Sequence, residues 1–240
     1  MQNPSRPPRT VVVTGATRGI GRSIAERFVA AGDRVATLSR GSDVPDGVLA
    51  VPGDVTDSAA VDAGFTAIEE QLGPVDVLVA NAGITRDGLL MRMSDADFDA
   101  VIDVNLAGAF RCARRASKGM IKQRSGRIVL ISSVVGLFGG PGQVNYAASK
   151  AGLVGVARSI TRELGGRGIT ANVVAPGYIR TAMTDELSET LQKTARASIP
   201  AGRFAEPEEV AGVVEFLAGP DAAYITGAVI PVDGGLGMGH

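Results

Sequence analysis

Seven short apolar runs, separated by longer segments with helical periodicity, constrain the fold of this 240-residue chain more than any other feature. Most of their residues are β-branched or small, so each run predicts a strand that is buried on both faces. Strands of this kind that alternate with helices form a parallel sheet covered on both sides. We therefore predict a doubly wound α/β fold with a seven-stranded, mainly parallel sheet, whose strands are 10–13, 34–38, 48–51, 75–80, 127–132, 170–175 and 228–232.

The segments between these runs predict how the chain is organised. Residues 94–122 and 146–165 have the periodicity of long helices, and Ser94 is suited to be the N-cap of the first. Residues 40–48, RGSDVPDGV, are too short and too rich in Gly and Pro for the usual crossover helix, so we expect a loop there. No linker or repeat divides the chain, and we predict a flexible tail (residues 1–9) followed by one domain (residues 10–240).

Charge and composition exclude several classes of protein. The formal net charge is −1 and the basic residues are scattered, which argues against a nucleic-acid partner. The apolar segments are too short to span a bilayer and residues 1–9 lack an apolar signal segment, so we expect a cytoplasmic protein without membrane insertion. Cys112 is the only cysteine and His240 the only histidine, so we expect no disulfide, no metal site and no Ser-His-Asp triad.

The first predicted strand runs directly into TGATRGIG, residues 14–21, and then into an amphipathic helix. Gly15, Gly19 and Gly21 let the backbone turn sharply, approach a pyrophosphate and pack the helix on the sheet, while the helix N-terminus faces the anion. The alternative is an ordinary strand-to-helix turn. Because both the strand before the motif and the helix after it are present, the motif favours dinucleotide binding.

The end of the second predicted strand indicates which dinucleotide is bound. NAD-binding chains place an acid there against the ribose 2′-hydroxyl, whereas NADP-binding chains place an arginine near the 2′-phosphate. This strand ends in Arg40, no acid lies between residues 36 and 40, and Arg18 in the glycine loop offers a second cation. The sequence therefore favours NADP(H), the alternative being two solvated surface arginines.

Candidate catalytic residues gather in the second half of the chain. Tyr146 and Lys150 lie one helical turn apart in the run NYAASK, and Ser133 precedes Tyr146 by 13 residues. A tyrosine is a poor acid near neutral pH, and a lysine at i+4 supplies a positive charge that favours the phenolate. Asn105 interrupts the apolar stripe of the 94–122 helix; a buried amide must be hydrogen-bonded, and the pattern fits a structural role and a catalytic role equally.

In this order and spacing the motifs resemble the classical short-chain dehydrogenase/reductases, a family with a Rossmann-type fold, over nearly the whole chain. The resemblance rests on TGATRGIG, Asp54, NAG at 81–83, Asn105, Ser133, YAASK and PGYIRT. Within that family the chain is most similar to bacterial 3-oxoacyl-[acyl-carrier-protein] reductases, through VNLAGAF, NYAASKAGL, ANVVAPGYI and DAAYITGAVIPVDGG. The missing crossover helix and the ending GLGMGH are similar to those of actinobacterial members.

The resemblance implies NADPH-dependent reduction of 3-oxoacyl-[acyl-carrier-protein] in type II fatty acid synthesis. Tyr146 would protonate the carbonyl oxygen, Ser133 would hydrogen-bond it, and Lys150 would hold the nicotinamide ribose and lower the tyrosine pKa. Asn105 would hold a water that relays protons to Lys150. The implied cofactor-binding residues are Gly15, Thr17, Arg18, Gly19, Ile20, Gly21, Arg40, Asp54, Val55, Asn81, Ala82, Gly83, Tyr146, Lys150, Pro176, Gly177, Ile179 and Thr181.

The resemblance also implies a partner, an assembly and a mobile element. Arg124 and Arg167 match the family's docking arginines for the acidic acyl carrier protein, which would need a basic patch beside the mouth of the site; each could equally be a solvated helix-end charge. Family members are usually homotetramers, with the 94–122 and 146–165 helices and the C-terminal strand at the interfaces. Residues 182–205 would form a substrate lid.

Two alternatives stay open. Another ketoreductase, acting on acetoacetyl-CoA, a polyketide or a small alcohol or ketone, would carry the same motifs, and Phe138, Met183 and residues 85–93 would help to decide between substrates. A non-catalytic dinucleotide-binding sensor typically loses the tyrosine or the lysine, and both are present here. The sequence leaves open the acyl chain length, the carrier (acyl carrier protein or coenzyme A), and a role in primary fatty acid, mycolic acid or polyketide synthesis.

Overall fold

The computed structural model describes residues 7–181, 184 and 189–238. In these ranges seven strands form one sheet of order β3-β2-β1-β4-β5-β6-β7, and every pairing is parallel. The predicted doubly wound fold is therefore confirmed, and the sheet is wholly rather than mainly parallel. The strands are β1 (Thr10–Thr14), β2 (Arg34–Ser39), β3 (Val48–Pro52), β4 (Val77–Ala80), β5 (Gly126–Ile131), β6 (Ile169–Pro176) and β7 (Val229–Val232).

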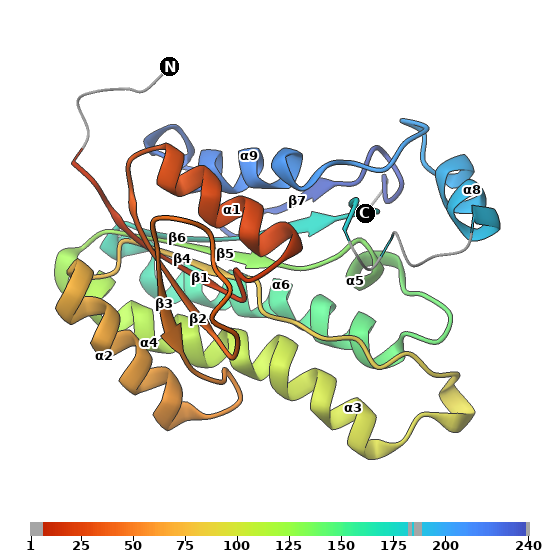
Figure 1. Cartoon of the computed structure of the whole chain (residues 1–240), viewed down its shortest axis with the longest axis horizontal. Helices are drawn as coiled ribbons and strands as arrows, with labels where there is room; N and C mark the ends of the chain where they lie inside the picture. Colours follow the sequence, from red (N-terminus) through yellow and green to blue (C-terminus); the bar gives the residue numbers. More distant parts are fainter. Residues whose placement is uncertain (1–6, 182–183, 185–188, 239–240) are drawn as a thin grey trace.

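Helices cover both faces of the sheet (Figure 1). On one face α1 (Gly19–Ala30) packs beside α9 (Pro207–Ala218), and Phe28 and Val214 enter one apolar core. On the other face lie α2 (Ser58–Leu72), α4 (Gly108–Gln123) and α6 (Val144–Leu164), and Phe65, Met120 and Leu153 enter a second core. The remaining helical elements are η1 (Leu90–Arg92), α3 (Asp95–Ile102), η2 (Asp103–Ala107), α5 (Val135–Phe138), η3 (Gly165–Arg167), α8 (Glu189–Ser198) and η4 (Pro220–Ala222).

The helix predicted over residues 94–122 consists of three consecutive pieces. Ser94 caps α3 as expected, accepting a hydrogen bond from the backbone N–H of Asp97. The chain then passes through the π-helical turn η2 before it continues as α4. Asn105 lies on this π-turn and is buried. Turns of this type are frequent at functional sites, because the extra residue changes which groups face outward.

The connection between β2 and β3 is a loop without helix, as Gly41, Pro45 and Gly47 predict. Arg9, the last residue of the predicted tail, contacts the domain: its backbone N–H and side chain donate to Asp33, and its guanidinium also contacts Ala218 O. Residues 1–6 lie outside the described residues. No helix within the described ranges combines the length and apolar character needed to cross a membrane.

Candidate active site

The glycine loop forms a tight turn between β1 and α1. Gly15 and Gly19 have φ angles of +71° and +55°, a region that L-residues with side chains rarely adopt. A Cβ at Gly21 would collide with Asn81 Nδ2 and with Gly15 O. The turn therefore needs glycine for its backbone conformation and for its contact with the end of β4. It leads into the N-terminus of α1, where the first N–H groups have no partner within the helix and could face an anion.

Asn81 and Thr14 join this turn to β4. Thr14 Oγ1 accepts the backbone N–H groups of Asn81 and Ala82, each at 3.0 Å. Asn81 Nδ2 donates to Thr14 O at 3.1 Å and to Gly15 O at 3.2 Å. The side chain of Asn81, which we predicted to contact the cofactor, thus holds the glycine turn in place.

The predicted adenosine end lies beside the loop that follows β2. Arg18 is the N-cap residue of α1, and both Arg18 and Arg40 are exposed. Hydrogen bonds from the backbone and side chain of Thr56 lower the pKa of Asp54, and the nearby charge of Arg40 lowers it further. The structure therefore brings Arg40 and Asp54 together. Val55 is buried against Gly108, where a Cβ would lie 2.8 Å from Val55 Cγ2.

The predicted nicotinamide end is built from the chain after β6. A Cβ at Gly177 would lie 2.9 Å from Asp233 Cα, so the main chain passes tightly against the C-terminal loop. Ile179 is buried, and Thr181 Cγ2 lies 3.4 Å from the position of a Cβ on Gly19. Pro176 O accepts a hydrogen bond from Val134 N–H at 3.0 Å. The PGYIRT segment and the glycine turn therefore adjoin.

The four predicted catalytic residues come together at the carboxyl ends of β4, β5 and β6. Ser133 follows β5 and hydrogen-bonds Tyr146, which lies in the first turn of α6. Lys150 is buried, and its Nζ donates to Ile131 O at 2.8 Å and lies 5.6 Å from the centre of the Tyr146 ring. A Cβ at Gly83 would lie 3.2 Å from Asn105 Oδ1 and 3.4 Å from Lys150 Nζ, which places these residues around one point.

The electrostatics of Tyr146 differ from our prediction. Burial of the phenol raises its pKa, the hydrogen bond with Ser133 lowers it, the negative charge of Asp87 raises it, and the net direction is upward. Burial likewise lowers the pKa of Lys150 to about 8. The pKa of Tyr146 therefore lies above its ordinary value, because desolvation of the phenolate outweighs the hydrogen bond with Ser133. A raised pKa keeps the phenol of Tyr146 protonated near neutral pH, which the predicted role of general acid requires.

The side chain of Asn105 makes three hydrogen bonds. Its Oδ1 accepts the backbone N–H of Ile84 at 2.8 Å, and its Nδ2 donates to Ile84 O at 3.0 Å and to Ser149 Oγ at 3.1 Å. The sequence did not single out Ser149 or Asn145, which both lie in the run NYAASK beside Tyr146 and are both buried. Their place in that run was the available signal.

The two predicted docking arginines lie elsewhere. Arg124 ends α4 and Arg167 ends η3, immediately before β5 and β6, and Arg124 Nη2 donates to Gly166 O at 3.4 Å. They adjoin each other at the amino ends of the strands, whereas the predicted catalytic residues lie at the carboxyl ends. The structure therefore does not place them beside the mouth of this chain's own site.

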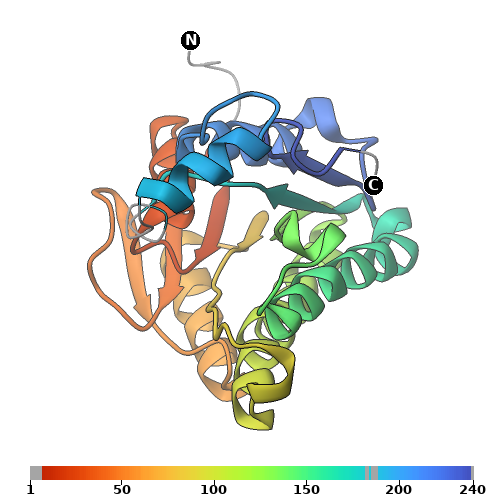
Figure 2. The same ribbon diagram turned by 90° about the vertical axis from the view of Figure 1, so that its right-hand side faces the viewer.

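A glycine turn at the first crossover of a parallel sheet, together with a Ser-Tyr-Lys-Asn centre at the same edge, defines a nicotinamide-dependent short-chain dehydrogenase/reductase. Tight approaches bring Gly21 against Asn81, and Gly83 close to Asn105 and Lys150. Figure 2 shows the molecule from the side on which α8 lies. The described residues contain no cluster of three His, Cys, Asp or Glu residues that could hold a metal ion.

Comparison with known proteins agrees. A family model described as "Enoyl-(Acyl carrier protein) reductase" matches residues 15–237. The 3-oxoacyl-[acyl-carrier-protein] reductase of Mycobacterium tuberculosis is 57% identical over 239 residues, covering 98% of this chain and 97% of that protein. The enzyme of the same name from Escherichia coli is 47% identical over 238 residues, covering 96% and 98%. The chain belongs to the short-chain dehydrogenase/reductase family and is an oxidoreductase.

Proposed function

We propose that the protein reduces the 3-oxo group of an acyl thioester on acyl carrier protein to a 3-hydroxy group, with NADPH as the reductant, in fatty acid synthesis. The observation that carries this proposal is the half-buried phenol of Tyr146, which is hydrogen-bonded to Ser133 and has its ring centre 5.6 Å from Lys150 Nζ at the carboxyl ends of the strands. Relatives with 57% and 47% identity, named for this reaction, support the substrate class.

The chain's own residues supply the proton and the orientation. The bound nicotinamide would supply the hydride. Ser133 donates its hydroxyl hydrogen to the substrate carbonyl oxygen, and Tyr146 transfers its phenolic proton to the same oxygen as negative charge develops there. Lys150 would hold the nicotinamide ribose, and its ammonium group would stabilise the tyrosinate that is left behind. Asn105 holds a water through which the proton is restored.

The test of this mechanism is Tyr146→Phe, which keeps the ring and removes the proton. Turnover of a 3-oxoacyl thioester should fall by at least about 100-fold, the low end of general acid catalysis, while NADPH affinity stays within about twofold. Initial rates on thioesters of several lengths, carried by acyl carrier protein and by coenzyme A, would fix the substrate. Near-normal turnover in the variant would remove Tyr146 from the mechanism; no turnover of any 3-oxoacyl thioester by the unaltered protein would refute the function.

Selectivity for NADPH follows from Arg18 and Arg40, which present exposed cations where a 2′-phosphate would lie. Arg40→Glu turns one attraction into a repulsion, so the Kd for NADPH should rise by about 30-fold, or about 2 kcal/mol, as judged by cofactor fluorescence. NADH affinity should change little and serves as the internal control. Equal catalytic efficiency of the unaltered protein with NADH and NADPH would contradict this assignment.

Docking of the carrier on Arg124 and Arg167 is part of the proposal, and it requires an oligomer. Both side chains are exposed and adjacent, and within the described ranges Arg124 is the one non-glycine residue with a positive φ, +52°. Since the pair lies at the amino ends of the strands, it can serve a site only if another copy places it beside that site's mouth. The homotetramer expected from the family would supply such a copy.

A further inference from the structure

Tyr146 is held through its backbone by two buried polar side chains. Asn145, fully buried, accepts the backbone N–H of Tyr146 on its Oδ1 at 2.7 Å. Its Nδ2 donates to Arg86 O at 2.8 Å and to Asp97 O at 3.3 Å. One amide therefore joins the first turn of α6 to the loop after β4 and to α3.

The second side chain is Ser149, which is also fully buried. Its Oγ donates to Tyr146 O at 2.8 Å and accepts from Asn105 Nδ2 at 3.1 Å. Asn105 in turn holds both the N–H and the C=O of Ile84. Both hydrogen bonds of this serine hydroxyl therefore join it to residues of the proposed catalytic centre.

These contacts close into a ring. From Tyr146 N–H the ring runs through Asn145 to Arg86 O, along the backbone to Ile84, and through Asn105 and Ser149 back to Tyr146 O. The ring fixes both main-chain polar groups of the residue that carries the phenol. It also ties the position of Tyr146 to that of Asn105, which lies on a different helical element.

We propose that Asn145 and Ser149 are positioning residues that set the place of the Tyr146 phenol relative to Ser133. A tyrosine side chain has few torsions, so its hydroxyl goes where its backbone goes, and a displacement of about 1 Å can cost about 100-fold in rate. Loss of one link leaves a buried donor or acceptor without a partner, which forces the ring to rearrange. The inference rests on the proposed role of Tyr146 as proton donor.

The alternative is that both side chains only satisfy backbone groups of α6. The first N–H groups of a helix have no partner within it, and Asn145 would then be an ordinary cap. This alternative predicts that substitutions lower stability and leave turnover by the folded protein unchanged. The positioning role instead predicts that kcat of the folded protein falls while cofactor binding changes little.

The primary test is Ser149→Ala with Ser117→Ala as the matched control. Ser117 makes the same kind of bond on a helix, from its Oγ to Arg114 O three residues back at 2.9 Å, at an exposed position. We expect kcat of Ser149→Ala to fall at least tenfold with the KM for NADPH within about twofold, and Ser117→Ala to be unchanged. Unaltered kcat in a folded Ser149→Ala protein would overturn the proposal.

A double-mutant cycle separates positioning from a general structural effect. In a Tyr146→Phe background no phenolic proton is left to position, so adding Ser149→Ala should leave the residual rate within about twofold. If it lowers the residual rate by the same factor as in the unaltered protein, Ser149 does not act through Tyr146. Should Ser149→Ala fail to fold, Asn145→Ala breaks the ring from its other side and enters the same cycle.

A readout without substrate keeps this test apart from the test of function. The chain has three tyrosines and no tryptophan, so tyrosinate absorbance is free of indole background, and subtraction of a Tyr146→Phe titration isolates Tyr146. The Ser133 bond lowers the Tyr146 pKa, so its loss in Ser149→Ala should move the titration to higher pH. An unmoved titration contradicts positioning even if no substrate has been found; an inactive unaltered protein contradicts only the proposed function.

Discussion

Lys150 carries its amino group into the interior of the protein. Its Nζ donates to Ile131 O, a neutral carbonyl, and within the described residues no carboxylate pairs with it, so its charge is desolvated without compensation. Below pH 8 both the folded and the unfolded chain hold this proton, and folding bears the full desolvation cost. Between the folded pKa of about 8 and the ordinary value of 10.5 the unfolded chain binds more protons, so this cost falls as pH rises.

Lys150→Met should therefore stabilise the cofactor-free protein while abolishing activity. The shift of the pKa from 10.5 to about 8 corresponds to roughly 3 kcal/mol, and loss of the bond to Ile131 O offsets about 1, which leaves about 2 kcal/mol at pH 7. The difference should shrink by pH 9.5. Urea unfolding at the two pH values measures it, with the exposed Lys122→Met as control. A variant less stable than the unaltered protein at pH 7 would contradict this account.

At the scale of residues, motif spacing predicted which side chains lie near the site, but it did not predict how buried they are or how their pKa values shift. Tyr146, Lys150, Ser133 and the glycines follow from sequence, because one helical turn and one strand-to-helix turn have fixed geometry. The rise in the pKa of Tyr146 could not be predicted from the sequence, since burial of the phenol depends on segments far away in the chain. Asn145 and Ser149 were missed for the same reason: their partners are fixed by the path of the loop after β4.

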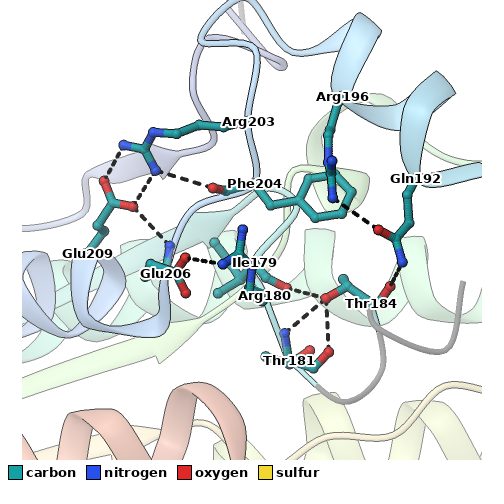
Figure 3. A network of polar contacts seen from close by, with 10 residues as sticks. All are labelled: Ile179, Arg180, Thr181, Thr184, Gln192, Arg196, Arg203, Phe204, Glu206 and Glu209. Atoms are coloured by element: carbon teal, nitrogen blue, oxygen red, sulfur yellow. Dashed lines mark hydrogen bonds and ion pairs between the residues drawn. The ribbon is translucent and has the colours of Figure 1, made fainter. Parts of the chain in front are cut away.

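Hydrogen bonds and an ion pair join the two ends of the segment that follows β6 (Figure 3). Arg180 N–H donates to Ala205 O at 2.8 Å and Ala205 N–H donates to Tyr178 O at 3.0 Å. An ion pair of 2.9 Å joins Arg180 to Glu206. Between these ends lies α8, within the predicted lid of residues 182–205; Met183 and most of its neighbours lie outside the described residues.

The described part of this segment is held by a small core of its own. Phe204 stacks on the ring of Tyr178, with ring centroids 5.4 Å apart. The guanidinium of Arg196 lies 5.2 Å from the centre of the Phe204 ring. Phe204 also packs with Ala195, Ile199 and Leu236 in a cluster separate from the two main cores. A segment held by so few apolar contacts should open locally before the domain unfolds.

Phe204→Ala should release α8 selectively. Removing a buried phenylalanine costs about 3–5 kcal/mol, more than so small a cluster can lose and still stay closed. Proteolysis between residues 189 and 203 should become at least tenfold faster, and the KM for the acyl thioester should rise, with little change in NADPH affinity. Phe216→Ala, at a half-exposed position on α9, is the control. Unchanged proteolysis would show that other contacts hold α8.

At the scale of elements, the strands and the loop between β2 and β3 were predictable, because apolar runs and Gly or Pro interruptions act locally. The interruption of the 94–122 helix at η2 was not. A π-turn keeps helical periodicity nearly intact, and it is selected by the contacts of Asn105 with Ile84 and Ser149 rather than by local propensity.

At the scale of the whole molecule, the predicted catalytic residues lie at the carboxyl ends of the strands and the proposed docking arginines lie at the amino ends. β5 and β6 have 6 and 8 residues, so about 20–26 Å separates their amino ends from their carboxyl ends. Arg86 in the loop after β4 and Arg92 on η1, by contrast, are exposed, and neither takes part in the ion pairs found among the described residues. The two arginine pairs therefore predict different modes of docking.

Reversal of Arg124 and Arg167 to Glu should raise the KM for carrier-bound substrate and barely affect short coenzyme A analogues, because only the carrier presents an extended acidic surface. The effect should weaken as salt rises, since exposed charges are screened over about 10 Å at 0.1 M. Equal losses on the small analogues would instead assign the pair a structural role. Reversal of Arg86 and Arg92 is the matched comparison: if it alone impairs carrier substrates, docking occurs at the catalytic edge.

Mixed oligomers decide whether docking acts between chains. The arginine-reversed chain keeps an intact site, and a Tyr146→Phe chain keeps the arginines, so co-assembly should restore carrier-dependent turnover if the arginines serve a neighbour. If each site uses its own arginines, mixing restores nothing. At the scale of the whole molecule, the fold class was predictable from the sequence. The position of Arg124 and Arg167 at the amino ends of the strands was not predicted, because it depends on where β5 and β6 begin.

The two ends of the described chain lie on opposite sides of the molecule (Figure 1). Arg9 enters β1 at the amino ends of the strands, whereas residues 233–238 fold back against α8 and Phe138: a Cβ at Gly234 would lie 2.8 Å from Ile199, and one at Gly237 would lie 3.7 Å from Phe138. We therefore expect that an affinity tag, fluorophore or surface linker joined at the carboxyl end of the chain will interfere with the proposed substrate site more than one joined at the amino end, so the amino end is the one to choose for immobilised assays.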